Sequence, residues 1–244
     1  MESQPPIYVI NMAKDTARMG SMAQQLAAQG LAYERVEAVV GRELDAEQKR
    51  DSFSPFWYGL LQGRAVTNAE LGCSLSHRKV WQMMIDRAQN WVVIFEDDAE
   101  LLPQFASQLA VIENETRDFD MVQLYAFRDP DKLDHVSPDA AFKVMRYSGP
   151  HGSTAAYAMR LSGAKKLMNI GKVWTAPDKW TWLSAVTGLN CCGIFPYPVR
   201  LEDQHSAVST ISAMAERKNN RLWLIAVLPI LRVVRFSIAK VRGV

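Results

Sequence analysis

The sequence predicts an α/β protein with a mostly parallel central sheet flanked by helices. Three observations lead to this fold class: a strand, a helix and a second strand at the start of the chain, an unbroken apolar run at 91–95, and 48% apolar with 9% aromatic residues. Disordered, collagenous and disulfide-built chains are excluded by this composition. The 244 residues suffice for one large domain, which we expect at 1–215, followed by a tail at 216–244.

The N-terminal segment has the pattern of a β-α-β unit. A short apolar run at 7–10 ends at Asn11, residues 15–29 carry apolar side chains at helical spacing, and Gly30 is suited to end that helix. Residues 33–40 are expected to form the second strand. Ligands usually bind where the strands of such sheets end, which places Asn11 at a candidate binding edge.

The rest of the chain continues with alternating helices and strands. The run at 91–95 has no polar alternation, which is typical of a strand buried on both faces. The remaining expected elements are an irregular, aromatic-rich segment at 51–67 able to cover a site, a helix from Ser74, a helix at 103–115, a strand at 121–125, a polar loop at 129–139, a strand at 155–159, and a helix N-capped by Ser162.

Three consecutive acidic residues, Glu96, Asp97 and Asp98, follow the buried strand directly. Ionised carboxylates that crowd together near a core are costly unless a positive charge compensates them. Mg²⁺ or Mn²⁺ would do so, because these ions prefer oxygen ligands from one or two carboxylates together with substrate phosphates. On an extended backbone Glu96 and Asp98 would point to one side and Asp97 to the other. The alternative is a solvated strand end with Asp98 as the N-cap of a following helix.

Several short segments occur in a characteristic order. The order is Thr67–His77, then Trp81, then Glu96-Asp97-Asp98-Ala99. Together these segments resemble the central motif of glycosyltransferase family 25, the family of lipo-oligosaccharide galactosyltransferases and their collagen-modifying relatives. Each piece is short, and the combined spacing gives the resemblance its specificity. It covers roughly residues 7–212, with a poor match at 174–205, and continues at 7–11 with Arg18, at 37–41, at 152–157, at 163–167 and weakly at 177–178.

The resemblance implies a GT-A-like fold, a UDP-sugar donor and a divalent metal, Mn²⁺ or alternatively Mg²⁺. It makes Asp98 the direct metal ligand, assisted by Glu96, which can also contact the donor, and allows the late His205 as a further ligand. The uridine diphosphate part would lie at Asn11 and Arg18. Turn capping by Asn11 and a surface salt bridge of Arg18 are the alternatives.

Three residues of the central motif are further donor-binding candidates on this resemblance. His77 would begin the helix that faces the acidic strand and hydrogen-bond a donor phosphate or sugar, and Glu70 and Ser76 are candidates for similar contacts. The alternative for each is an ordinary polar side chain in a helix. Cys73 has apolar neighbours and is expected to be inert packing.

Sugar transfer needs a base that takes the proton of the acceptor hydroxyl while the diphosphate leaves. Asp178 is the candidate, because it falls at the later acidic position of the resemblance. Trp180 and Trp182 follow it and offer ring faces for a sugar. The alternative is Asp178 as a helix N-cap, and Glu202 and Asp203 are rival bases.

The tail differs sharply in charge from the body. Residues 217–244 carry seven basic and no acidic residues, which leaves 21 basic against 26 acidic residues elsewhere. At 100° per residue the basic side chains fall within an arc of about 160°, as in an amphipathic helix at an anionic membrane surface. Docking on the acidic body is the alternative. The basic residues form no broad face, so a nucleic-acid partner is not expected.

Nothing in the chain suggests secretion or a membrane span. The three cysteines include the vicinal pair Cys191 and Cys192 and make no disulfide framework. The N-terminus lacks the basic region of a signal peptide. The apolar run 222–231 has about half of the ~20 residues that a membrane span needs. We expect a cytoplasmic protein held peripherally at the inner face of a membrane.

The resulting hypothesis is an inverting, metal-assisted transferase that moves a hexose, galactose, from its UDP carrier to a glycolipid acceptor of lipopolysaccharide type. A catalytically inactive sugar- or nucleotide-binding scaffold of the same fold is the alternative. A nucleotidyltransferase would show a glycine- and lysine-rich phosphate loop after the first strand, and residues 11–14 (Asn-Met-Ala-Lys) are not one.

Overall fold

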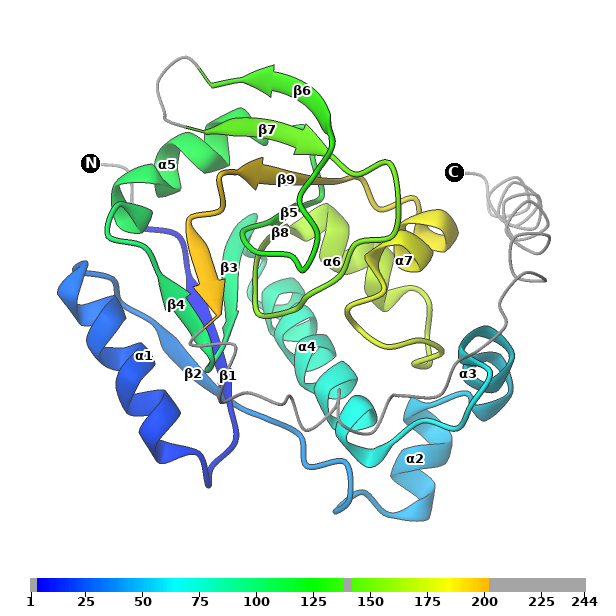
Figure 1. The fold of residues 1–244 in the computed structure, drawn as a ribbon. Helices are drawn as coiled ribbons and strands as arrows, with labels where there is room; N and C mark the ends of the chain where they lie inside the picture. Colours follow the sequence, from blue (N-terminus) through cyan, green and yellow to red (C-terminus); the bar gives the residue numbers. More distant parts are fainter. Residues whose placement is uncertain (1–3, 138–141, 202–244) are drawn as a thin grey trace.

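Strands and helices alternate through residues 4–137 and 142–201, which the computed structural model describes (Figure 1). The strands are β1 (Ile7–Asn11), β2 (Glu34–Glu37), β3 (Trp91–Glu96), β4 (Ala99–Leu101), β5 (Met121–Gln123), β6 (Lys132–Val136), β7 (Lys143–Arg146), β8 (Ala156–Arg160), β9 (Cys191–Phe195) and β10 (Val199–Leu201). The helices are α1 (Thr16–Ala28), α2 (Ala46–Ser52), α3 (Pro55–Gln62), α4 (Asn68–Asp86), α5 (Phe105–Glu115), α6 (Leu161–Met168) and α7 (Trp180–Thr187). His205, Glu202, Asp203 and the predicted tail lie outside the described residues.

One large sheet has the strand order β2-β1-β3-β8-β5-β9-β7-β6. Its β1 lies between β2 and β3 and is parallel to both, and β5 is parallel to β9. The antiparallel pairings of β8 and β7 show that these two strands run against the other six. The predicted α/β fold with a mostly parallel sheet flanked by helices is confirmed. A separate antiparallel pair joins β4 to β10.

The two faces of the sheet have separate cores. On β3, Trp91, Val93 and Phe95 join a cluster with α1 and α5, whereas Val92 and Ile94 join a second cluster with α4, α6 and α7. Figure 1 shows these two sets of helices on opposite sides of the sheet. Because both faces of β3 are covered, the strand has no polar alternation, as its sequence indicated.

Helix α4 begins at Asn68, six residues before the predicted start at Ser74. Its N-terminus is a capping box: the Glu70 amide donates to the Thr67 hydroxyl over 3.1 Å, and the Thr67 amide donates to the Glu70 carboxylate over 2.9 Å. Thr67-x-x-Glu70 is the sequence signature of this cap. The expectation that His77 begins the helix is therefore wrong, since it lies in the third turn.

The first turns of α4 pack directly against the backbone that follows β2. A Cβ added at Gly41 would lie 2.0 Å from the Asn68 carbonyl oxygen, and one added at Gly72 would lie 2.5 Å from the Val39 carbonyl oxygen. Only glycine permits this approach of two backbones. The Ser76 hydroxyl reinforces it, accepting from the Val39 amide over 2.8 Å.

Three local expectations are wrong. Residues 51–67 are not irregular, because they contain α3. This helix begins with Pro55, at a position where the backbone needs no amide hydrogen, and it is capped at its C-terminal end by Gly63 with φ +66°. The predicted polar loop contains β6, an edge strand whose mostly exposed side chains hide the strand pattern. Ser162 is not an N-cap: Arg160 occupies that position, and the Ser162 hydroxyl donates to Asp120 over 2.6 Å. No helix among the described residues is both long and apolar enough to cross a membrane.

Candidate functional site

The acidic triplet lies at the edge of the sheet where β1 and β3 end and β8 begins. Ile10 pairs with Glu96 in the parallel register of β1 and β3, and Phe95 pairs with Ala156 in the antiparallel register of β3 and β8. The Glu96 amide donates to the Ala155 carbonyl over 2.9 Å. Residues 96–98 are thus bordered by the end of β1 on one side and by the segment before β8 on the other.

Glu96 is held by one of its two oxygens. Its Oε1 lies 3.0 Å from Nε2 of His77 and 3.8 Å from Sγ of Cys73, and it accepts a short hydrogen bond from the Thr154 hydroxyl. Burial alone would raise the pKa of Glu96, but the interactions with His77 and Thr154 outweigh burial and keep the pKa below its ordinary value. The carboxylate is therefore ionised, and Oε2 makes no hydrogen bond within the described residues.

His77 is 1% exposed and uses both ring nitrogens. In a neutral imidazole, a hydrogen on Nε2 that points at Glu96 leaves Nδ1 to accept from the Tyr157 hydroxyl 2.8 Å away. The same hydroxyl oxygen accepts from Trp81 Nε1 over 3.0 Å. Both ring nitrogens are thus engaged within the protein, which does not support the expected contact of His77 with a donor sugar or phosphate. The side chain lies behind Glu96 and positions it.

Asp97 faces the opposite direction, toward β1 and α1. It accepts from Asn11 Nδ2 over 2.7 Å and lies 3.5 Å from Arg18 Nη1. Asn11 is 2% exposed and also accepts a hydrogen bond from Arg35 Nε over 2.8 Å. Its buried side chain therefore fixes the position of Asp97. Burial raises the pKa of Asp97, and Asn11 and Arg18 only partly oppose this. Arg18 forms the salt bridge weighed as the alternative, on the first turn of α1, and its side chain is 48% exposed.

Asp98 is the least compensated of the three carboxylates. Its Oδ1 is buried without a hydrogen-bond partner among the described residues. Burial, followed by the charges of Glu96 and Asp97, raises the pKa of Asp98 to about 7. Asp97 and Asp98 form a turn that leads directly into β4, so no helix follows and the N-cap alternative is wrong. The same turn breaks the extended alternation expected across 96–98. An orphaned buried oxygen and a surplus of carboxylates fit a divalent cation held by Asp98 and Glu96.

A second group of potential metal ligands shares Glu96. Cys73 Sγ, His77 Nε2 and a Glu96 carboxylate oxygen all lie within 4.8 Å of one another. A cation between them would displace the hydrogen bonds from His77 and Cys73 to Glu96. Burial raises the pKa of the Cys73 thiol well above its usual range, which keeps it protonated and a weak ligand. Cys73 is more than inert packing, because it contacts the carboxylate.

Glu70 and Ser76 serve the fold at this site. Glu70 accepts hydrogen bonds from Arg64 Nη1 over 2.8 Å and from Thr67. Burial alone would raise the pKa of Glu70, but these partners outweigh the effect of burial and lower the pKa to about 2. The Ser76 hydroxyl also donates to the Gly72 carbonyl over 2.7 Å. Both side chains are buried and engaged within the protein, which does not support their expected donor contacts.

Residues 151–154 connect Asp178 to the acidic triplet. A Cβ added at Gly152 would lie 2.8 Å from the Asp178 carbonyl oxygen and 3.3 Å from its Oδ2, and Thr154 donates to Glu96 two residues further on. Ser153 between them has φ +141°, a strained conformation for a residue with a side chain. Its carbonyl accepts from Gln123 Nε2 over 3.1 Å and from Trp180 Nε1 over 2.8 Å, which holds the strained segment in place.

Asp178 is paired with Lys179, whose Nζ lies 3.1 Å from its Oδ2. It is not the N-cap of α7: Lys179 occupies that position, and no side chain caps the helix. Trp180 is fully buried beneath Ser153, so the expectation that its face holds a sugar is wrong. The segment at 152–157 already resembled the family, but nothing local in the sequence signals that Thr154 and Tyr157 contact Glu96 and His77.

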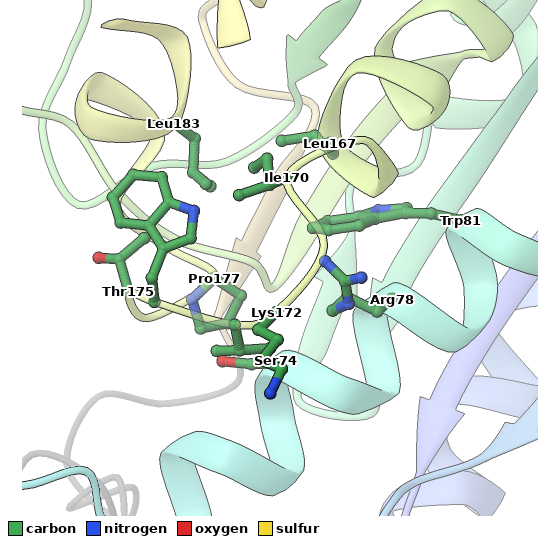
Figure 2. Close-up of a pocket in the computed structure, with 11 residues that line it drawn as sticks. Ser74, Arg78, Trp81, Leu167, Ile170, Lys172, Thr175, Pro177 and Leu183 are labelled. Atoms are coloured by element: carbon green, nitrogen blue, oxygen red, sulfur yellow. The ribbon is translucent and has the colours of Figure 1, made fainter. Parts of the chain in front are cut away.

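A small pocket lies beside this site, between α4, α6, α7 and the segment that leads to Asp178. Figure 2 shows Arg78 and Trp81 of α4 on one side and Leu183 of α7 across from them, with Ser74 and Pro177 next to each other at the bottom. Its lining is mainly apolar and includes no carboxylate. The pocket therefore does not form part of a cation site, although Trp81 links it to the Tyr157–His77 contacts.

Clustered, undercompensated carboxylates lie at the carboxyl edge of an α/β sheet, the edge at which ligands usually bind in such folds. The family model described as Glycosyltransferase family 25 (LPS biosynthesis protein) matches residues 4–182. The chain belongs to glycosyltransferase family 25. The match is shorter at its C-terminal end than the resemblance to residue 212 suggested.

Several curated proteins are similar to this chain. A glycosyltransferase 25 family member of Aedes aegypti is 30% identical over 66% of this chain and 27% of its own length. The inactive glycosyltransferase 25 family member 3 of Homo sapiens is 30% identical over 66% of this chain and 28% of its own. Procollagen galactosyltransferase 1-A of Xenopus laevis is 28% identical over 67% of this chain and 28% of its own. The matched region thus spans little more than a quarter of these relatives.

Among solved structures, a glycosyltransferase involved in the glycosylation of the major capsid of PBCV-1 is similar over 66% of this chain and 63% of that one. The TM-score is 0.32 and the identity 8%, a likeness too slight to bear on function.

Proposed function

We propose that this protein is an inverting, metal-assisted hexosyltransferase on a GT-A-like sheet. It transfers galactose from UDP-galactose to a glycolipid acceptor of lipopolysaccharide type. The family description refers to lipopolysaccharide biosynthesis, and the Xenopus laevis relative is named a galactosyltransferase. These names support the choice of sugar and acceptor.

The observation that carries the proposal is the state of Asp98. A carboxylate with an orphaned, buried oxygen beside two further acids is destabilising unless a cation or a proton compensates it. Asp98 and Glu96 would hold Mn²⁺ or Mg²⁺, with Oε2 of Glu96 available because Oε1 is already engaged. When bound, the cation neutralises charge that develops on the departing diphosphate.

The remaining steps belong to side chains of this chain. Asn11 fixes Asp97, and the half-exposed Arg18 contacts the diphosphate of the donor. Asp178 takes the proton of the acceptor hydroxyl, whose oxygen bonds to the anomeric carbon as the bond from that carbon to the diphosphate oxygen breaks. Attack opposite the leaving group in a single displacement inverts the anomeric configuration. Lys179 pairs with Asp178 and stands beside the reacting carboxylate.

The charge pattern of residues 217–244 supports peripheral attachment to an anionic membrane, where a glycolipid acceptor is held. A cytoplasmic location at the inner face of the membrane belongs to the same proposal. It places the catalytic domain in the reducing compartment in which three free cysteines are stable.

A scaffold without catalysis is the second candidate, because one relative at 30% identity is named inactive. The two candidates differ in their need for a cation. An enzyme requires the metal to bind and turn over the donor, whereas a scaffold binds nucleotide independently of the metal or does not bind it.

The deciding experiment incubates the purified full chain with a panel of UDP-sugars, a lipo-oligosaccharide acceptor, and either Mn²⁺ or a chelator. We expect a galactosylated product by mass spectrometry only with UDP-galactose and metal, together with Mn²⁺-dependent donor binding in calorimetry. Transfer from another UDP-sugar alone would correct the donor. Absence of both turnover and metal-dependent binding with every donor would overturn the proposal.

A further inference from the structure

The most exposed large apolar side chain among the described residues is Phe127, at 70%. It follows β5 and ends a row of aromatic rings. Its ring meets Tyr125 edge-on at 5.8 Å, and Tyr125 packs against Tyr197 at 5.9 Å. Tyr125 is only 9% exposed and Tyr197 is partly buried, so Phe127 is the most exposed ring of the row. The face of the Phe127 ring is thus open to a ligand that can stack on it.

The loop that carries Phe127 is fixed from both sides. The Phe127 amide donates to the Gly152 carbonyl over 3.1 Å, and the Tyr197 hydroxyl donates to the Arg128 carbonyl over 2.9 Å. Arg128 also lies 3.2 Å from Asp131. The exposed ring is therefore presented by an ordered backbone, which lowers the entropy cost of binding a ligand to it.

Phe127 is a neighbour of the proposed base. Its amide donates to the Gly152 carbonyl, and Asp178 lies next to the same glycine, where an added Cβ would be 3.3 Å from Asp178 Oδ2. Within the sheet, β8 alone separates β5 from β3, so the ends of β5 and β3 are about 10 Å apart at the usual strand spacing. Because β5 and β3 run in the same direction, their carboxyl ends lie at the same edge of the sheet, so Phe127 and the acidic triplet border one face of the molecule's candidate site.

We infer that Phe127 is the floor of an acceptor-sugar subsite, on which the apolar C–H face of a pyranose ring stacks. Aromatic faces attract such C–H surfaces, while the sugar hydroxyls at the ring edge reach polar groups. The exposed side chains of Arg128 and Asp129 supply these groups beside the ring. The inference rests on the proposed function, because it assigns the ring to the acceptor of that transfer.

Phe127 acts on acceptor binding and not on the chemistry at the donor. Replacing Phe127 with Ala removes the stacking surface, whereas Phe127→Trp keeps one. The matched control is Phe56→Ala on α3, because that phenylalanine is equally exposed, at 69%, and makes an edge contact with Trp57 away from the sheet edge. We expect Phe127→Ala to raise the acceptor KM about five- to tenfold, with kcat at saturating acceptor within about twofold of wild type.

The test has a readout independent of turnover. Methyl glycosides of galactose, glucose and N-acetylglucosamine are titrated into the full chain and followed by saturation-transfer difference NMR. We expect transfer to the ring protons of at least one glycoside in wild type, Phe127→Trp and Phe56→Ala, and its loss in Phe127→Ala. Donor binding in calorimetry is expected to be unchanged in all four proteins.

The subsite would be overturned if Phe127→Ala left either the glycoside signal or the acceptor KM unchanged. It would also be overturned if none of the three glycosides gave a signal with the wild type. Equal losses in Phe127→Ala and Phe56→Ala would also overturn it, because the effect would then be general. Failure of the proposed function has a different signature: no donor turnover occurs with any variant, whatever the glycosides do.

Discussion

Nε2 of His77 lies 3.0 Å from Oε1 of Glu96, with the imidazole almost entirely buried. With a neutral imidazole, the hydrogen bonds from Trp81 to Tyr157, from Tyr157 to His77 and from His77 to Glu96 all run in one direction, with the histidine hydrogen on Nε2. A histidine oriented in this way holds a carboxylate by one oxygen and leaves the other for a ligand. Tyr157 is the member that can be altered without touching the proposed metal site directly.

Tyr157→Phe removes the hydroxyl that serves both His77 and Trp81 and leaves a buried acceptor and a buried donor unpaired. We expect the free energy of unfolding to fall by about 1–3 kcal/mol and Mn²⁺-dependent donor binding to weaken. Denaturant unfolding and calorimetry measure the two effects. The control Tyr33→Phe, at a 38% exposed site, should change neither. Wild-type stability in Tyr157→Phe would show that the buried hydroxyl is dispensable.

Asp98→Asn tests the uncompensated carboxylate. The pKa of Asp98 is raised from 3.8 to about 7, so the folded state binds more protons between these values. Stability therefore falls as the pH rises from about 4 to about 7, and the full loss is present above 7. Without metal, Asn should therefore raise the Tm by about 2 °C or more at pH 8, with a smaller gain at pH 5. Transfer should fall at least about tenfold, because the cation loses a ligand.

Differential scanning calorimetry with and without Mn²⁺ completes that test. The wild type should gain thermal stability from the metal, and Asp98→Asn should not. Asp118→Asn is the control, because this aspartate is exposed. A metal-induced shift that persists in Asp98→Asn would place the cation elsewhere.

Gly152→Ala tests the contact between residues 151–154 and Asp178. The added methyl group would lie 2.8 Å from the Asp178 carbonyl oxygen, so one of the two segments must move. Displacement of a reacting group by about 1 Å is enough for a hundredfold loss, and we expect transfer to fall at least about tenfold with donor affinity retained. Gly20→Ala on α1, where a Cβ meets nothing within 4 Å, should leave the activity unchanged. Full activity of Gly152→Ala would argue against Asp178 as the base.

The ion pair between Arg64 and Glu70 should make the stability of the fold sensitive to acid. The pKa of Glu70 is lowered from 4.5 to about 2, so its stabilising contribution is complete above 4.5 and is lost as pH falls toward 2. Unfolding by urea between pH 5 and pH 2 should show this loss in wild type and a flatter profile in Glu70→Gln. Glu43→Gln, at a side chain that is 68% exposed, should follow the wild type. Identical profiles for Glu70→Gln and wild type would contradict the pairing.

Truncation after Ala215 tests the basic tail. Each basic residue near an anionic surface contributes about 1 kcal/mol, so vesicle binding should be salt-sensitive in the full chain and lost in the truncated one. Cosedimentation with anionic and neutral vesicles measures this, and donor binding serves as the control. Aggregation of the truncated protein would identify the tail as part of the core. Equal binding of the full chain to neutral and anionic vesicles would exclude the electrostatic contribution.

Local sequence patterns were sufficient to predict the helices and strands in which the spacing of apolar residues reflects the buried face. The apolar run of β3 indicated a strand covered on both faces, and the helical spacing after β1 indicated α1. The Thr67-x-x-Glu70 signature contains the true start of α4, although the apolar period begins only later in the helix. In contrast, β6 is an exposed edge strand, and exposure removes the alternation on which strand prediction depends.

The sequence by itself also determined that carboxylates gather at the end of a buried strand, because charge and order are properties of the chain. Only the tertiary structure decided their separate roles. Glu96, Asp97 and Asp98 are consecutive, yet one is held by α4 and the segment before β8, one by β1 and α1, and one has a buried oxygen without a partner. These partners lie up to 86 positions away along the chain. Hydrogen bonding and burial depend on distance in space, which no local pattern encodes.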